Sequence, residues 1–294
     1  MENKFYLGSH VSMSSPEFYL GSVKSALEYG ENTFMFYTGA PQNSFRLPLE
    51  RLRIEEGRAL LKENGIDESK IIVHAPYLIN LGSKAKPDTY DLAKKLVINE
   101  LQRTSAFGCT MLVLHPGNHL GVGTEEGLNN IVEGLNYIFE NDGTTVKIAL
   151  ETMAGKGTEL GTSFEDLNYI IKNCKYPERL GVCLDTCHIN DAGYDVNDVD
   201  AIINKFDEVI GLDRLLCMHI NDSKNVIGAH KDRHDNLGYG TIGFETLNAY
   251  VHHPKLVNIP KCLETPYVGE KAPYKKEVAM LREGKFEDNW RENL

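Results

Sequence analysis

Residues 146–151 read VKIALE, an apolar run that stops at Glu151. Apolar runs of similar length that end at a polar residue recur along the whole chain. In order, the eight runs are FYLGSH (5–10), NTFMFY (32–37), KIIVH (70–74), TMLVLH (110–115), VKIALE (146–151), GVCLD (181–185), LLCMH (215–219) and PKCLE (260–264). Short apolar runs rich in β-branched residues are typical of strands buried on both faces.

Helical signals separate these runs. Ser15-Pro16-Glu17 predicts a helix start with a serine cap and a proline in the first turn. Ser163 with Asp166 predicts another start, and Asn64-Gly65 predicts a helix end. An apolar stripe at helical spacing consists of Leu128, Ile131, Leu135 and Ile138. Strands that alternate with helices eight times predict an α/β fold, a single (β/α)8 TIM barrel over residues 1–294.

The composition is that of an ordinary globular domain, with 294 residues, 41% hydrophobic and 25% charged. The N-terminal stretch MENKFYLGSHVS has no basic segment before a long apolar run, so we expect no secretory signal. We expect no membrane-spanning segment either. The six cysteines form no CxxC pair, and we expect reduced, mostly buried thiols in a cytoplasmic protein. The net charge of −11 argues against a nucleic-acid partner unless bound cations and a local basic patch offset it.

The residues that end the runs carry the strongest functional indication. In a (β/α)8 barrel the carboxyl ends of all strands meet at one face, where active sites lie. Charged side chains are seldom buried there unless they are paired or bind a metal. Seven of the eight runs end in His, Asp or Glu. Besides His10, which ends the first run, these residues are His74, His115, Glu151, Asp185, His219 and Glu264, and we expect these six to point into one shared pocket.

Three more side chains extend this set. In DTCH, His188 follows Asp185 by three residues. The long glycine-containing segment 221–243 holds Asp232 and His234 two residues apart, and an extended chain places such a pair on one side. Long loops in compact domains are usually functional.

Together these side chains predict a cluster of divalent metal ions. Four carboxylates in one pocket would repel one another without cations, and the five interleaved histidines supply the nitrogen ligands that zinc favours. Nine donors exceed the needs of one tetrahedral ion. Shared among three ions, they leave open positions for water and substrate, which suits catalysis.

The chain also resembles the endonuclease IV (deoxyribonuclease IV) family of apurinic/apyrimidinic endonucleases. The resemblance covers nearly the whole chain, from LGSHVS to CLETP. Its motifs are HAPYLINLG (74–82), LHPGNHLG (114–121), LETMAGKGTELG (150–161), GVCLDTCH (181–188), MHINDSK (218–224), DRHDNLGYGTIG (232–243) and LETP (263–266). The family fold is a xylose isomerase-like (β/α)8 barrel with three zinc ions.

The resemblance implies an assignment of ligands. His74 and His115 would hold the first metal, and Glu151 would bridge the first and second while acting as the catalytic residue. Asp185, His219 and Glu264 would complete the second site. The third would consist of His188, Asp232 and His234. Mn²⁺ can occupy similar ligands, so the resemblance implies three Zn²⁺ with Mn²⁺ as an alternative at some sites.

The implied activity is hydrolysis of the phosphodiester 5′ to an abasic site in duplex DNA, leaving 3′-hydroxyl and 5′-deoxyribose phosphate ends. Blocked 3′ ends would be processed at the same centre by 3′-phosphatase or 3′-phosphodiesterase activity. The resemblance further implies a monomer, and we expect it in the cytoplasm, associated with the nucleoid through DNA.

The resemblance also implies DNA contacts. Tyr77 and Leu78 match residues that the family inserts beside the lesion. A third such residue, an arginine in the loop after the second strand, has Arg46 as its candidate here, in a loop of different length. We expect the loop cations Lys224 and Arg233 to contact phosphates. Lys156 and Lys231 are further candidates, and His10 and His119 are expected to support the site structurally.

Two other functions fit part of the pattern. A metal-dependent sugar isomerase or epimerase of the xylose isomerase-like type would need only a strand-end set such as Glu151, Asp185, His219 and Glu264. A noncatalytic DNA- or metal-binding protein would need no open coordination positions. The additional histidines and the Asp232-x-His234 pair favour the endonuclease.

Overall fold

The eight predicted strands form one parallel sheet that closes into a barrel. The structure, a computed structural model, describes residues 5–294. The strands are β1 (Leu7–Ser9), β2 (Met35–Tyr37), β3 (Ile72–His74), β4 (Met111–Leu114), β5 (Lys147–Glu151), β6 (Leu180–Asp185), β7 (Leu215–His219) and β10 (Lys261–Leu263). They follow the order β1-β10-β7-β6-β5-β4-β3-β2. A parallel bridge between His10 and Met35 joins the β1 and β2 edges and completes the barrel.

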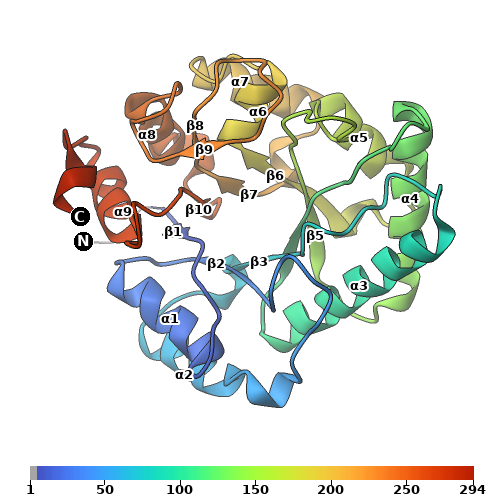
Figure 1. Ribbon diagram of the computed structural model, residues 1–294, viewed down its shortest axis with the longest axis horizontal. Coiled ribbons are helices and arrows are strands. Elements are labelled where there is room, and N and C mark those ends of the chain that lie inside the picture. Colours follow the sequence, from blue (N-terminus) through green and yellow to red (C-terminus); the bar gives the residue numbers. More distant parts are fainter. Residues whose placement is uncertain (1–4) are drawn as a thin grey trace.

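Helices surround the strands (Figure 1). They are α1 (Phe18–Glu28), α2 (Ile54–Glu63), α3 (Pro87–Ala106), α4 (Thr124–Asn141), α5 (Phe164–Asn173), α6 (Thr186–Ala192), α7 (Val199–Val209), α8 (Phe244–His252) and α9 (Tyr274–Glu283). The predicted fold class is therefore confirmed. Among the described residues, no helix is both long and apolar enough to cross a bilayer.

Alternation along the strands divides the core into two layers. In β4, Met111 and Val113 belong to a cluster inside the barrel, whereas Leu112 and Leu114 pack outward with the helices. Successive strand residues point to opposite faces, so this split is expected. The inner cluster consists of Met35, Ile72, Met111, Val113, Ala149, Cys183, Cys217 and Cys262. It fills the barrel below the carboxyl ends of the strands.

The helix starts and ends predicted from the sequence can be compared with those in the structure. The Ser163 hydroxyl accepts a hydrogen bond from the Asp166 amide at 3.1 Å, as expected for a cap, and Gly65 follows α2 with a φ of 67°. The four stripe residues of α4 are all buried. The predicted Ser15 start is wrong, because a turn closed by Phe18 N and Ser14 O precedes α1, which begins at Phe18. All six cysteines are buried free thiols.

The connection between β7 and α8 is the long predicted loop. It contains a two-stranded antiparallel ribbon of β8 (Asp222–Ser223) and β9 (His234–Asp235). Asp222 is fully buried, and its carboxylate accepts hydrogen bonds from the amides of Gly238, Gly240 and Ile242. This carboxylate holds the glycine-containing turn in place, so the ribbon stands fixed beside the barrel mouth.

Candidate metal centre

Strand alternation explains why the donor side chains meet. Glu151 follows the inward-facing Ala149 by two residues, and Asp185 follows the inward-facing Cys183 in the same way. The same step leads from an inner-layer residue to each of the other strand-end donors, which are His74, His115, His219 and Glu264. These side chains therefore form the next layer of the barrel interior, at its carboxyl end.

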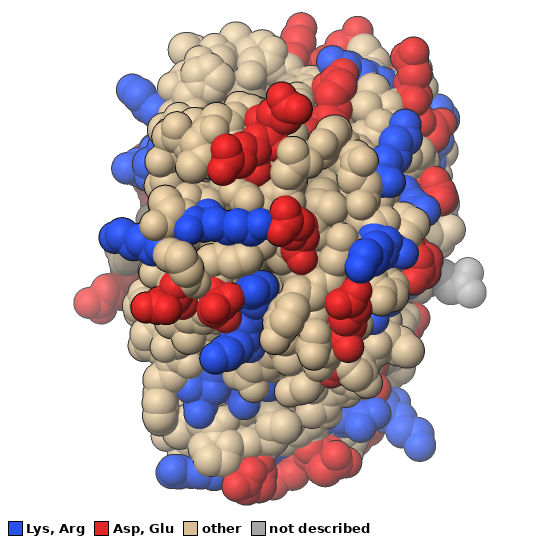
Figure 2. Space-filling model, turned by 90° about the vertical axis from the view of Figure 1, so that its right-hand side faces the viewer, with Lys and Arg blue, Asp and Glu red and all other residues tan. Residues whose placement is uncertain are grey.

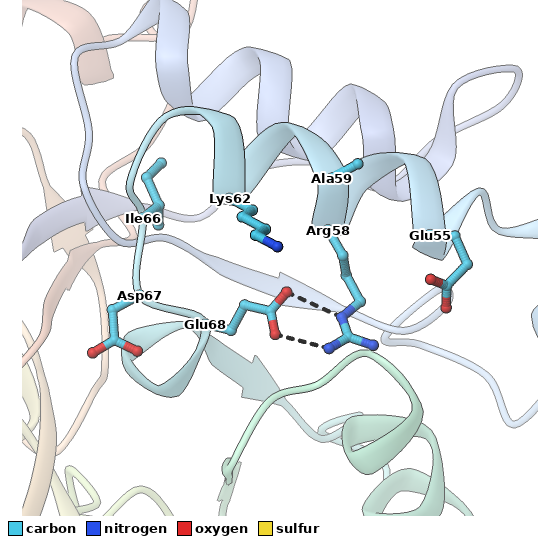
Figure 3. A pocket seen from close by; sticks show the side chains of 7 residues that line it. All are labelled: Glu55, Arg58, Ala59, Lys62, Ile66, Asp67 and Glu68. Atoms are coloured by element: carbon cyan, nitrogen blue, oxygen red, sulfur yellow. Dashed lines mark hydrogen bonds and ion pairs between the residues drawn. The ribbon is translucent and has the colours of Figure 1, made fainter.

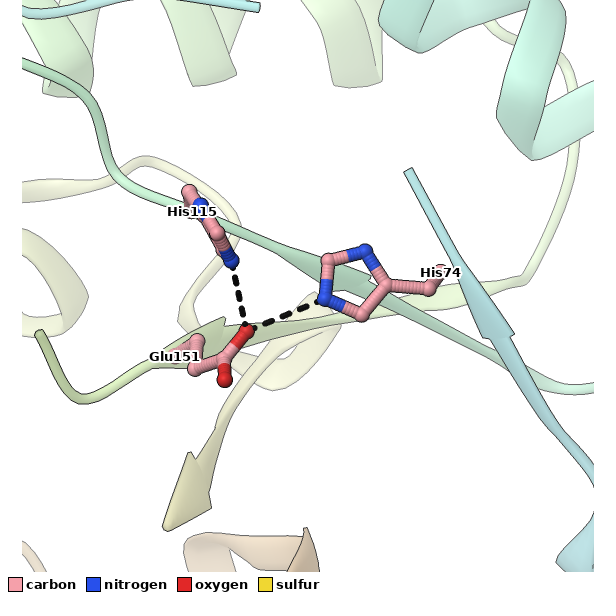
Figure 4. A group of neighbouring side chains, drawn as sticks. All are labelled: His74, His115 and Glu151. Atoms are coloured by element: carbon pink, nitrogen blue, oxygen red, sulfur yellow. Dashed lines mark hydrogen bonds and ion pairs between the residues drawn. The ribbon is translucent and has the colours of Figure 1, made fainter. Parts of the chain in front are cut away.

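Glu151 lies at the centre of the cluster. Its Oε2 atom is 3.1 Å from His74 Nε2 and 3.0 Å from His115 Nε2 (Figure 4). Its Oε1 atom is 3.0 Å from His219 Nδ1 and 3.4 Å from His188 Nδ1. One carboxylate thus faces two groups of histidines through its two oxygens, an arrangement that suits a bridge between two cations.

A second group of donors lies on the Oε1 side of Glu151. His219 Nδ1 is 3.0 Å from Glu264 Oε2 and 3.7 Å from Asp185 Oδ2. One ligand atom from each of these three residues and from Glu151 lies within 4.8 Å of the others, a spacing compatible with a shared ion. These residues come from β5, β6, β7 and the residue after β10.

The third group combines a helix with the β8–β9 connection. His188 in the first turn of α6 has its Nε2 3.1 Å from Asp232 Oδ1. His234 Nε2 is 3.5 Å from the same oxygen and 3.7 Å from Asp185 Oδ2. Cys187 also lies near Asp232 and His234, but burial raises the pKa of its thiol, which disfavours the thiolate form that binds metal.

Backbone carbonyls orient three of the histidines. The Nδ1 atoms of His74, His188 and His234 lie 2.7, 2.8 and 3.3 Å from the carbonyl oxygens of Ala75, Thr152 and Glu264. A carbonyl can only accept, so each Nδ1 carries a proton, and when the ring is neutral its Nε2 offers a lone pair to a metal. Carbonyl partners of this kind fix the tautomer of metal-binding histidines.

The charges of the cluster stabilise one another in the absence of a metal. Burial by itself would raise the pKa of Glu151, but His219 and His115 hold it well below its usual value. Burial would lower the pKa of His188, yet Asp185 and Asp232 raise it well above normal, and Glu264 and Glu151 do the same for His219. Protons on these rings occupy the place that cations would take.

The donor set fits divalent metal ions. Among the described side chains of the cluster, His234 Nε2 is buried without a hydrogen-bond partner, 3.5 Å from Asp232 Oδ1 and 3.7 Å from Asp185 Oδ2. Buried polar atoms are usually paired, and the His234 atom faces two carboxylates. Imidazole and carboxylate ligands suit Zn²⁺ and Mn²⁺.

Supporting residues were missed in the sequence. The Asn221 amide donates to Asp185 Oδ2 at 2.7 Å, and its carbonyl oxygen accepts from the Glu264 amide at 2.7 Å. Buried Asp191 accepts from the Asp232 amide at 2.9 Å. Asn221 follows His219 by two residues, so strand alternation could have found it. Asp191 lies in α6 and offered no such signal.

The expected DNA-contact residues differ in where they lie. Tyr77 and Leu78 are 55% and 39% exposed, and Lys224 and Arg233 are exposed on the β8–β9 connection. Arg46 does not lie at the surface. Its side chain is 5% exposed, and its Nε donates to buried Glu100 at 2.6 Å. In this position Arg46 holds its own loop, and its expected contact with DNA stays a prediction.

The remaining residues that were expected to contact phosphates or to support the site lie near the barrel mouth. A cleft of about 340 Å³ beside the cluster is lined by residues that include Tyr77, His115, Lys156 and Asp232. Lys231, the residue before Asp232, is exposed to solvent. The His119 ring accepts hydrogen bonds from the Gly121 and Gly123 amides, each at 3.2 Å, which is a structural role. The His10 ring contacts Tyr37 edge-on, with centroids 5.1 Å apart.

A cavity larger than this cleft lies elsewhere. About 570 Å³ in volume, it lies between α2 and the turn Glu68–Lys70 that precedes β3, at the amino end of the strands. Arg58 and Glu68 form a two-point ion pair in its wall, with both N–O distances 3.0 Å (Figure 3). This cavity is separate from the metal donors.

Over the side of the molecule that carries α3, α4 and α5, acidic and basic side chains are interspersed (Figure 2).

Comparison with known proteins identifies the class and the family. Residues 23–284 match the family described as xylose isomerase-like TIM barrel, which is the class that the barrel and the donors at its mouth define. Proteins called probable endonuclease 4 from Oceanobacillus iheyensis and Bacillus thuringiensis are 52% and 54% identical to the chain, with 98% of each chain covered. This chain belongs to the endonuclease IV family.

Solved structures agree with this membership. Endonuclease IV from Thermus thermophilus superposes with a TM-score of 0.83 at 27% identity, covering 98% of this chain and all of that one. A 3-keto-D-glucoside 4-epimerase from E. coli superposes with a TM-score of 0.68 at 16% identity, covering 95% and 99%. The epimerase shares the fold alone.

Proposed function

We propose that the protein is a DNA-repair endonuclease that hydrolyses the phosphodiester 5′ to abasic sites in duplex DNA. The products would be a 3′-hydroxyl and a 5′-deoxyribose phosphate, and the same centre would remove blocking groups from 3′ ends. The observation that carries the proposal is the position of Glu151 between two groups of histidines. The relatives named endonuclease 4 support the reaction class.

The donors would hold three divalent ions, Zn²⁺ or in part Mn²⁺. His74 and His115 would bind one, Asp185, His219 and Glu264 another, and His188, Asp232 and His234 a third, with Glu151 shared by the first two. Bound divalent ions supply Lewis acidity, which neutralises phosphate charge and makes water a nucleophile near neutral pH.

The protein's own groups then orient the reaction. Glu151 positions the attacking water and accepts its proton on a carboxylate oxygen. Asn221 donates from its side-chain amide to the Asp185 carboxylate and accepts from the backbone amide of Glu264, so it holds these two residues in register. In the low-dielectric barrel mouth these fixed groups need little reorganisation as charge develops on the phosphate oxygens.

Access to the site requires the abasic nucleotide to leave the helix. Extrusion costs a few kcal/mol and is easiest where no base is stacked or paired, which selects the lesion without reading sequence. Tyr77 and Leu78 would fill the vacated space. Lys156, Lys224, Lys231 and Arg233 are the candidates for phosphate contacts. We further propose that the enzyme acts as a monomer in the cytoplasm, at the nucleoid.

The test combines metal analysis with incision of a duplex that carries one abasic analogue. We expect divalent metal in the purified protein and a nick on the 5′ side of the lesion. Glu151→Gln should reduce incision by at least about a thousandfold, since a group used in the transition state is lost. A folded protein without bound metal or incision would refute the proposal, and unchanged turnover of the variant would refute the role of Glu151.

A further inference from the structure

Exposed large apolar residues gather on the loops that follow the barrel strands. Among the described residues, Leu92 in α3 and Tyr137 in α4 are the exceptions. The others are Phe45, Tyr77, Leu78, Leu120, Val226, Ile227 and Tyr267. Apolar side chains that share one exposed face indicate an interaction surface.

Val226 and Ile227 form an apolar tip that the proposed chemistry does not use. They are 69% and 50% exposed, in the connection between β8 and β9. The backbone around them is fixed, because the Gly228 amide donates to Asn190 O at 2.9 Å and the Ala229 amide to Val226 O at 3.2 Å. Two branched side chains are thus held in solvent by an ordered turn.

The tip lies across the barrel mouth from the expected lesion wedge. In the closed order of eight strands, β3 and β7 are separated by four positions and are therefore opposite one another. Tyr77 and Leu78 follow β3, whereas Val226 and Ile227 follow β7. The metal donors lie between these two apolar pairs.

The surroundings of the tip are basic. Lys224, Lys231 and Arg233 are all exposed in the same connection, within a protein of net charge −11. An apolar tip with cations before and after it in the chain is complementary to a DNA duplex, in which phosphates lie on both sides of the stacked base pairs. Apolar side chains inserted between base steps are a known means of gripping DNA, and cations provide the salt-dependent part of the affinity.

We propose that Val226 and Ile227 insert into a groove of the duplex on the side of the metal centre opposite to Tyr77 and Leu78. The enzyme then holds the DNA at two apolar contacts with the target phosphate between them. This inference rests on the proposed function and adds to it a second gripping element.

The test compares three variants in equilibrium binding. The ligand is an abasic-analogue duplex already nicked 5′ to the lesion, so that turnover does not interfere, and the salt concentration is varied. V226S/I227S should weaken binding about tenfold or more, without changing the slope of log affinity against log salt. K224A/R233A should reduce that slope by about 2, because each phosphate contact contributes about 0.9. Leu92→Ser, 49% exposed on α3, is the matched control and should bind like wild type.

Each outcome is decisive. A V226S/I227S affinity within twofold of both wild type and Leu92→Ser would overturn the inference while leaving the endonuclease assignment intact. If V226S/I227S lost bound metal as well as affinity for the duplex, the inference would also be overturned, since the tip would then affect binding through the metal centre. If wild type neither prefers nor incises an abasic duplex, the proposed function itself fails.

Discussion

Arg46, in the loop after β2, forms a buried ion pair with Glu100 of α3. Glu100 is fully buried and also accepts a hydrogen bond from the Thr38 hydroxyl at 2.6 Å. The Arg46 guanidinium donates in addition to the carbonyl oxygens of Asn43 and Phe45. The loop therefore keeps its arginine inside and presents Phe45, which is 70% exposed.

Replacing this arginine should affect stability more than catalysis. Arg46→Met leaves the Glu100 carboxylate buried without its cation, and loss of one partner of a buried pair lowers the free energy of unfolding by about 3–5 kcal/mol. Urea denaturation measures this. Arg53→Met, which removes an exposed pair with Glu56, should cost less than about 1 kcal/mol. Equal losses would contradict the role assigned to Arg46, as would a fall in incision beyond the loss of folded protein.

At the scale of elements, Asp191 joins α6 by hydrogen bonds to the segment between β8 and β9. Its Oδ1 accepts from the Ser223 hydroxyl at 2.7 Å, and its Oδ2 accepts from Asn225 Nδ2 and the Asp232 amide, both at 2.9 Å. Helix α6 also carries His188. One carboxylate thus sets the position of the connection relative to the histidine with which Asp232 shares a site.

Asp191→Asn should weaken the third metal site selectively. The asparagine amide would face hydrogen-bond donors, so part of this network is lost, and outer-shell changes of this kind lower metal affinity by about 10–100-fold. Metal stoichiometry after dialysis against a chelator measures the effect. Asp222→Asn is the control, since that buried carboxylate holds the turn at 238–243 instead. If both variants lose the same metal, the connection through Asp191 is not specific.

The sequence allowed the strand elements to be predicted better than the elements that support the site. Donors such as Glu151 and Asp185 could be found because each ends an apolar run, which is a local pattern. Asp191 could not be found, because a polar residue in a short helix looks the same whether it faces water or a buried network. The burial of the Arg46 side chain could not be foreseen for a related reason. Its partner Glu100 lies 54 residues away in α3, and no local pattern reveals such a pair.

For the whole molecule, stability should depend on pH in opposite ways with and without metal. Without metal, nearby carboxylates outweigh burial and raise the pKa of His188 and His219 above 6.5. The stability they contribute is therefore present below pH 6.5 and is lost as the pH rises through the raised values. Metal binding needs unprotonated rings, so it strengthens over the same range.

The expected result is that the melting temperature gained from metal grows between about pH 6 and pH 8. Thermal melts of the metal-bound and chelator-treated proteins at both pH values give this difference. Proton release on adding Zn²⁺ to the chelator-treated protein provides an independent check. A stabilisation that is constant or smaller at the higher pH would contradict the exchange of protons for metal.

The two-residue step from the inner layer to the metal donors restricts which insertions and deletions the chain can tolerate. Removing one residue from β5 after Ala149 would bring Glu151 to the outward-facing position of Leu150 and turn the bridging carboxylate toward the helices. Loops beyond the strand ends that hold no metal donor are free of this constraint. Changes of length should therefore accumulate in segments such as 38–48, whereas the spacing inside each donor-bearing strand stays fixed.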